Sequence, residues 1–91
     1  MITIPVSGGS GSVSLNFGHI KCEGVSLISP DNTPMYSFWI LNEAGAFIVG
    51  ANAIDVQRTK ISEQFALDGI CTLTVEDAAD DGEYKVQIFQ R

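Results

Sequence analysis

The sequence predicts an all-β domain, an antiparallel sandwich of seven to eight short strands. Stretches of alternating apolar and polar residues recur along the chain, and clusters of Gly, Pro, Asn, Asp and Ser separate them. Strands at this spacing, with turn signals between them, are typical of sandwiches. No segment has a convincing amphipathic helix pattern, and 91 residues correspond to a single domain.

The composition excludes several kinds of partner. Eleven acidic residues against five Lys and Arg give a formal charge of −6, and only Arg58 and Lys60 lie close together in the sequence. Nucleic-acid binding requires a basic stripe that neutralises phosphates, so we expect neither nucleic acid nor an anionic membrane as a partner. Hydrophobic residues make up 45% of the chain, which indicates either an unusually full core or an apolar surface covered by a partner protein. The second interpretation is preferred.

The targeting signals and the cysteine spacing indicate in which compartment the protein is made and whether its cysteines are paired. No apolar run is long enough to span a bilayer, and the first residues lack the charged start and long apolar stretch of a signal peptide. We therefore expect cytoplasmic synthesis without export. Cys22 and Cys71 form no CxxC pair and are predicted to be buried free thiols in a reducing compartment, with a disulfide as the alternative.

Residues 1–12 are predicted to form an arm and a hinge, and residues 13–91 the sandwich. Met1–Val6 has β-type alternation, and Pro5 suits an edge or a strand end. Ser7–Ser12 contains only Ser and Gly, a composition typical of a flexible linker. It lacks the Lys and the following helix of a phosphate-binding loop.

The segments that follow are predicted to be strands and turns. Residues 13–17 alternate until Gly18 breaks the pattern, and a second alternating stretch has a phase slip at Glu23-Gly24 that predicts a bulge. Turn residues fill positions 29–34, and Met35–Leu41 is predicted to be a central strand. The remaining predictions are a hairpin loop at Asn42–Gly45, one or two irregular strands within residues 50–69 with a short helix at Ser62–Leu67 left open, a turn at Asp68-Gly69 and a strand at Ile70–Val75.

The run from Leu73 to Val86 is the most informative part of the chain. It indicates a strand, a tight acidic turn and a second strand entered by Tyr84. The pattern Asp80-x-Gly82-x-Tyr84 resembles the tyrosine corner of immunoglobulin-like sandwiches, in which a buried Tyr bonds to upstream backbone.

Residues 20–90 resemble an immunoglobulin-like domain at further positions. Trp39 stands at the place of the core tryptophan of strand C. The positions of strands B and E correspond to Cys22, Leu73 and Val75. The resemblance implies one core that contains Trp39, Leu73, Val75, Tyr84, Val86 and Ile88. Two features depart from the family: Val86 replaces the second cysteine of the inter-sheet disulfide, and no residues after Arg91 supply strand G.

Without strand G, the strand at Tyr84–Phe89 is expected to have a vacant edge, and natural proteins normally cover such edges. Met1–Val6 is the best candidate to cover it, either within its own domain or by strand addition to a neighbouring subunit. The predicted interface residues are Ile2, Ile4, Val6 and Phe89.

No arrangement of residues predicts catalysis, a metal ion or a cofactor. His19, the single histidine, lies beside Gly18 and is interpreted as a turn residue, because a catalytic triad needs a nucleophile, a base and an orienting acid. One His and two separate Cys do not make a zinc site. The carboxylates between Glu76 and Glu83 are interpreted as a solvated corner in which Asp80 bonds local backbone, with calcium as the alternative.

The predicted function is structural rather than enzymatic. A small, acidic, β-rich chain with a Gly/Ser hinge resembles, in overall style, the virion proteins of tailed bacteriophages, including head decoration (cement) proteins and minor tail or fibre proteins. That resemblance implies a place in the virion and docking on other virion proteins such as a capsid lattice, or self-association.

The alternative function is that of a small adhesin-like or carbohydrate-binding sandwich whose loops, such as Ser29–Pro34 and Gly50–Lys60, contact a ligand. A separate candidate is a sugar-binding platform formed by Tyr36, Phe38 and Trp39. Core packing of Trp39 is the preferred interpretation, because alternation points either Trp39 or both of the others inward.

Overall fold

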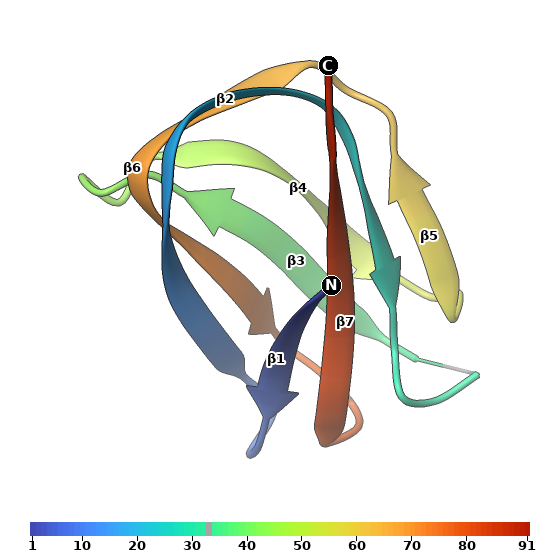
Figure 1. The fold of residues 1–91 in the computed structure, drawn as a ribbon. Helices are drawn as coiled ribbons and strands as arrows, with labels where there is room; N and C mark the ends of the chain where they lie inside the picture. The colour runs from blue at the N-terminus through green and yellow to red at the C-terminus, as the bar shows by residue number, and fades with distance from the viewer. Residues whose placement is uncertain (33) are drawn as a thin grey trace.

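The computed structural model describes residues 1–32 and 34–91 and confirms an all-β antiparallel domain. The predicted turn at 29–34 includes Thr33, which lies outside the described residues. The seven strands are β1 (Ile2–Val6), β2 (Gly11–Ile28), β3 (Tyr36–Leu41), β4 (Phe47–Ile54), β5 (Arg58–Ile61), β6 (Phe65–Glu76) and β7 (Gly82–Gln90) (Figure 1). The described residues contain no helix, and the segment at 62–67 leads into β6.

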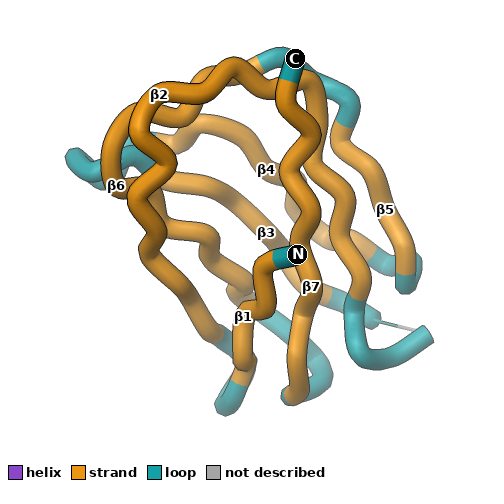
Figure 2. Tube along the Cα trace, viewed as in Figure 1, coloured by secondary structure: helices purple, strands orange, loops and turns teal. Residues whose placement is uncertain are grey.

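The strands form one hydrogen-bonded sheet that folds into two facing layers (Figures 1 and 2). The order is β1-β7-β2-β6-β3-β4, with β5 paired to β2 outside this path. β2 belongs to both layers, because its N-terminal half pairs with β6 and its C-terminal half with β7 and β5. We call β1, β7, β5 and the C-terminal half of β2 the front layer, and the N-terminal half of β2 with β6, β3 and β4 the back layer. This architecture is compatible with an immunoglobulin-like sandwich.

β2 is longer than any predicted strand because a bulge bends it instead of ending it. The pairing with β6 shifts register between Asn16 and His19, where Gly18 has a φ of +66°. Gly69, with a φ of +64°, lies at the same place on β6. Glycine adopts positive φ without steric cost. The predicted strand break at Gly18 and the predicted turn at Asp68-Gly69 are therefore wrong, since both are irregularities within paired strands.

Two other local predictions are confirmed. The bulge at Glu23-Gly24 corresponds to a register shift between Cys22 and Gly24 in the pairing of β2 with β7. In the hairpin loop after β3, Gly45 has a φ of +85° and donates its N–H to the carbonyl of Asn42 at 2.9 Å. The side chain of Asn42 accepts a further hydrogen bond from the backbone N–H that follows the loop.

The Gly/Ser segment, which the sequence predicts to be a hinge, forms a tight turn in the structure. The Ser7 N–H donates to the Ser10 carbonyl at 3.1 Å, and Gly8 and Gly9 have φ values of +66° and +88°. Positive φ at both central residues is the geometry of a two-residue hairpin turn. A side chain at Gly11 would lie 2.1 Å from the carbonyl oxygen of Pro5, so β2 begins in close contact with the arm.

The core lies between the two layers. Its buried apolar residues are Ile4, Val6, Cys22, Val25, Leu27, Tyr36, Phe38, Ile40, Val49, Ile54, Leu67, Cys71, Leu73, Val75, Tyr84 and Val86. Four of the predicted core residues, Leu73, Val75, Tyr84 and Val86, are among them, and Ile88 is partly buried against this cluster.

The predicted core position of Trp39 is wrong. On β3, Tyr36, Phe38 and Ile40 point inward and Trp39 is half-buried on the opposite side. The alternation along a strand allows only one of these two arrangements. Burial of three large apolar side chains removes more apolar surface from water than burial of one indole, so the three are inside.

The tyrosine corner is confirmed. The Tyr84 hydroxyl donates to the backbone carbonyl of Asp80 at 2.8 Å, and Gly82 enters β7 with a φ of +140°. A Cβ on Gly82 would lie 3.0 Å from Pro30, so the corner packs closely on the loop after β2. The Tyr84 ring meets the Tyr36 ring of the back layer edge-on, with centroids 4.9 Å apart and an interplanar angle of 69°.

Candidate functional site: a half-covered strand edge

The N-terminal arm covers part of the edge of β7, as predicted, and it does so within its own domain. β1 pairs antiparallel with β7 from Ile2 opposite Val86 to Val6 opposite Gly82. Ile4 and Val6 are buried in the core. They are therefore unavailable as the contact residues that the sequence predicts, because alternation turns the apolar side of β1 inward.

The other half of this edge has no strand beside it in the described part of the chain. Gln87–Gln90 pairs with β2 on one side, and the pairing with β1 ends at Val86. Figure 1 shows the N-terminus about halfway along β7, with the arch of β2 beyond it. A groove of about 370 Å³ lies here. It is lined by Met1, Ile2, Phe17, Ile20, Val86, Gln87, Ile88 and Gln90.

This groove combines the two properties of a strand-addition site. The backbone of an edge strand offers unpaired N–H and C=O groups. Beside it, Phe17, Ile20 and Ile88 are only partly buried against the core and can receive the alternate side chains of an incoming strand. The arrangement is suited to binding an extended segment.

The predicted contact residues occupy different places around this edge. Ile2 lines the groove. Phe89 lies on the front layer, where the ammonium group of Lys60 is 4.8 Å from its ring centroid. Sequence reasoning found the edge but missed Phe17 and Ile20, because their position depends on the bend in β2, and a period-2 pattern carries no signal for such a bend.

The outer face of the back layer carries a second candidate surface around Trp39. In the ladder, Trp39 lies between Thr74 of β6 and Gly50 of β4, and Ser12 of β2 lies beyond Thr74. These residues border a hollow of about 220 Å³. Its lining is Ser10, Gly11, Ser12, Trp39, Leu41, Thr74 and Glu76.

Two Ser–Thr pairs on this face differ in their hydrogen bonding. The hydroxyls of Ser14 and Thr72 are bonded to each other at 2.8 Å. Ser12 and Thr74, the next pair along the same strands, make no side-chain hydrogen bond within the described residues. Both residues line the hollow beside Trp39; Ser12 is exposed, and Thr74 is 8% exposed.

The acidic corner is organised differently from the prediction. The backbone of Asp80 accepts the bond from Tyr84, while its carboxyl is hydrogen-bonded to Asp31, and this bond is the main cause that raises the pKa of Asp80. Among the described residues, no group of three or more His, Cys, Asp or Glu is arranged to hold a metal ion.

The hydroxyl of Tyr36 is buried and has no hydrogen-bond partner among the described residues. Burial, and to a smaller extent the neighbouring Tyr84, raises the pKa of Tyr36 to about 12. The Tyr84 hydroxyl, by contrast, donates a hydrogen bond to the backbone carbonyl of Asp80.

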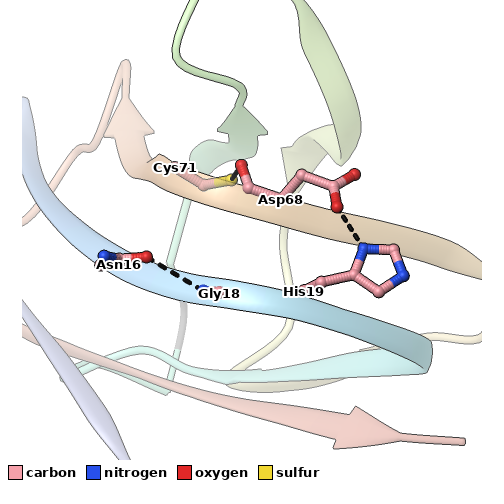
Figure 3. Close-up of polar contacts among 5 residues, drawn as sticks. All are labelled: Asn16, Gly18, His19, Asp68 and Cys71. Carbon is pink, nitrogen blue, oxygen red and sulfur yellow. Dashed lines mark hydrogen bonds and ion pairs between the residues drawn. The ribbon is translucent and has the colours of Figure 1, made fainter.

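His19 lies at the bulge of β2 with its side chain exposed and pairs with the carboxylate of Asp68 across the ladder (Figure 3). The side chain of Asn16 accepts a hydrogen bond from the N–H of Gly18 at 3.0 Å. These contacts stabilise the bend in β2.

Both cysteines are free and buried, as predicted. In the ladder Cys22 lies opposite Phe65 and Cys71 opposite Leu15, so the two are not cross-strand partners. Burial raises the pKa of the Cys22 thiol. A thiol with a raised pKa reacts slowly, because the thiolate is the reactive form.

No helix of the described residues is long and apolar enough to cross a membrane. Comparison of the chain with protein families, curated proteins and solved structures gives no match.

Proposed function

We propose that this protein is a non-enzymatic structural component of a larger assembly, which docks by strand addition at the open half of β7. The observation that carries the proposal is the groove beside Gln87–Gln90, where an unpaired strand edge meets partly buried apolar side chains. The occupant is an extended segment of a neighbouring protein subunit, with alternate apolar residues that continue the line of β1.

The setting we propose is a virion, with the protein as a decoration or cement protein on the capsid lattice of a tailed bacteriophage. Support comes from the size, the acidity and the 45% hydrophobic composition, together with the open edge. A net charge of −6 favours a neutral or basic segment as the occupant.

The proposal is tested by mixing the purified chain with capsid particles of a tailed bacteriophage and separating bound from free protein by sedimentation. Ile20→Lys places a charge in the groove and is expected to abolish binding. Ile70→Lys is the matched control, since Ile70 is 44% exposed on β6 and lies outside the groove. Circular dichroism verifies that both variants fold.

Hydrogen exchange gives a second measurement of the same idea. The amides of Gln87–Gln90 should become protected in the bound state, and light scattering of the protein alone shows whether a second copy fills the groove. A monomer that binds no particle, or a bound protein without new protection on β7, would contradict the proposal.

A second candidate function, glycan recognition, is favoured by the Trp39 surface. An aromatic face beside free hydroxyls and one carboxylate can stack on a sugar ring and bond its hydroxyl groups. Trp39 is the single tryptophan, so titration with neutral oligosaccharides such as cellohexaose or maltohexaose should change its fluorescence. Thr74→Val should weaken binding and Thr72→Val should not, whereas unchanged fluorescence at millimolar sugar excludes this function.

A further inference from the structure

The outer face of the front layer gathers three of the five basic residues of the chain. Arg58 and Lys60 lie on β5, and Lys85 lies on β7. Both strands pair with the same stretch of β2, from opposite sides. Arg58 and Lys60 are close in the sequence, and the strand order brings Lys85 to them.

The ladder fixes the positions of these cations. Ile28 lies between Arg58 and Lys85 in one row, and Ser26 lies between Lys60 and Gln87 in the next row. Leu27, between them in the sequence, is buried, so alternation directs the two rows outward.

A groove of about 400 Å³ runs over these rows. It is lined by Met1, Ser26, Leu27, Ile28, Arg58, Thr59, Lys60, Lys85 and Gln87. This described lining contains no Asp or Glu.

The three cations form no ion pair within the described residues, where His19 with Asp68 is the pair that occurs. The chain has eleven acidic and five basic side chains, so carboxylates outnumber the cations that could pair with them. Unpaired charges of one sign around a groove create a local potential opposite to that of the whole protein.

We propose that this groove binds an oxyanion, a phosphate or sulfate group, between Arg58 and Lys85. Neighbouring strands are about 4.8 Å apart, so the two backbones stand roughly 10 Å from each other across β2. Both side chains are long enough to reach one anion above Ile28 from opposite sides.

Each residue has a distinct part in this site. The guanidinium group of Arg58 offers a planar fork for two oxygens, and the ammonium of Lys85 acts as a point charge. Ser26 and Gln87 in the next row supply neutral donors. Lys60, whose ammonium group lies over Phe89, adds positive potential at one end of the groove.

The test uses the full chain and NMR titration of its backbone amides with inorganic phosphate, with sulfate and with dextran sulfate, which carries the same group on a polymer. Neutral dextran is the control ligand. Shifts are expected on β2, β5 and β7 around the groove, and they should weaken as the salt concentration rises. Response to the inorganic ions identifies a free anion as the ligand, and response to dextran sulfate alone identifies a group carried on a polymer; both support the site.

Substitutions distinguish binding of the anion at this specific site from general attraction by positive charge. Arg58→Gln and Lys85→Gln should each weaken binding roughly tenfold or more, the usual effect of losing a charge-assisted bond. Lys21→Gln makes the same change of charge at an exposed position of β2 that does not line the groove, and it should leave binding unchanged. Equal weakening by all three variants, or no shifts with any of the anions, would overturn the proposal.

Discussion

The front and back layers share one core but present different chemistry on their outer faces. The front face holds Arg58, Lys60 and Lys85 around its groove, while the hollow on the back face combines Trp39 with hydroxyl groups and Glu76. Alternation along each strand decides which residues point outward. The order of the strands decides which outward residues meet, and this is why two faces of one small sheet differ.

The largest expected effect comes from neighbouring residues on β3 that point in opposite directions. Phe38→Ala should lower the free energy of unfolding by about 3–5 kcal/mol, because Phe38 is completely buried. Trp39→Ala should cost less, about 1–3 kcal/mol, since the indole lies on the outer face and keeps part of its surface in water. Urea denaturation of both variants measures the difference. If Trp39→Ala were more destabilising than Phe38→Ala, Trp39 would point into the core and Phe38 would point outward.

The next effect concerns Gly50, which lies opposite Trp39 in the ladder. A Cβ at this position would lie 2.2 Å from the Phe38 carbonyl oxygen and 2.7 Å from the Cβ of Trp39. Gly50→Ala should therefore destabilise the protein by about 1–3 kcal/mol through overpacking. Asn52→Ala, at an exposed position of the same strand, is the control and should be nearly neutral. If both variants melt at the same temperature, β3 and β4 are not closely packed at this point.

The two tyrosines, one from each layer, give a smaller and more selective contrast. Tyr84→Phe removes the bond to Asp80 and should cost about 1 kcal/mol. Tyr36→Phe removes a buried hydroxyl that has no partner in the described structure, so it should be neutral or stabilising. Thermal unfolding measures both variants. The contrast disappears if Tyr36→Phe is as destabilising as Tyr84→Phe.

The same tyrosines predict how stability depends on alkaline pH. The pKa of Tyr36 is raised from 10.0 to about 12 in the folded protein. Between these values the unfolded chain loses the proton first and the folded protein holds more protons, so stability falls as the pH rises through this window. Denaturation curves measured across this window give the free energy of unfolding at each pH. This free energy should fall more steeply with pH for the wild type than for Tyr36→Phe. Identical slopes would show that another group controls alkaline unfolding.

The sequence predicts what depends on nearby residues. The tyrosine corner, the hairpin at Asn42–Gly45 and the bulge beside Gly24 each follow from a few adjacent residues, and the structure confirms all three. The pairing of the arm with β7 was also predictable. The edge strand has unpaired backbone groups that need a partner, and the arm has an apolar side that is stabilised by burial.

Features that depend on competition or on distant pairing were not predictable. Trp39 points away from the core because Tyr36, Phe38 and Ile40 on the other side of β3 bury a larger combined apolar surface. Gly18 and Gly69 read as ends of strands, but each becomes a bend because the opposite strand continues through it. The groove with Arg58 and Lys85 requires knowledge that β5 and β7 flank the same strand.

The membership of β2 in both layers has a consequence for how the protein folds. Gly11, its first residue, pairs with Val75, and Cys22 pairs with Gln90, so each layer depends on pairing between residues that are far apart in the sequence. Topologies dominated by such non-local pairing fold on the millisecond to second scale. Because one continuous strand runs through both layers, we expect them to form and to be lost together, in a single cooperative transition without a half-folded species.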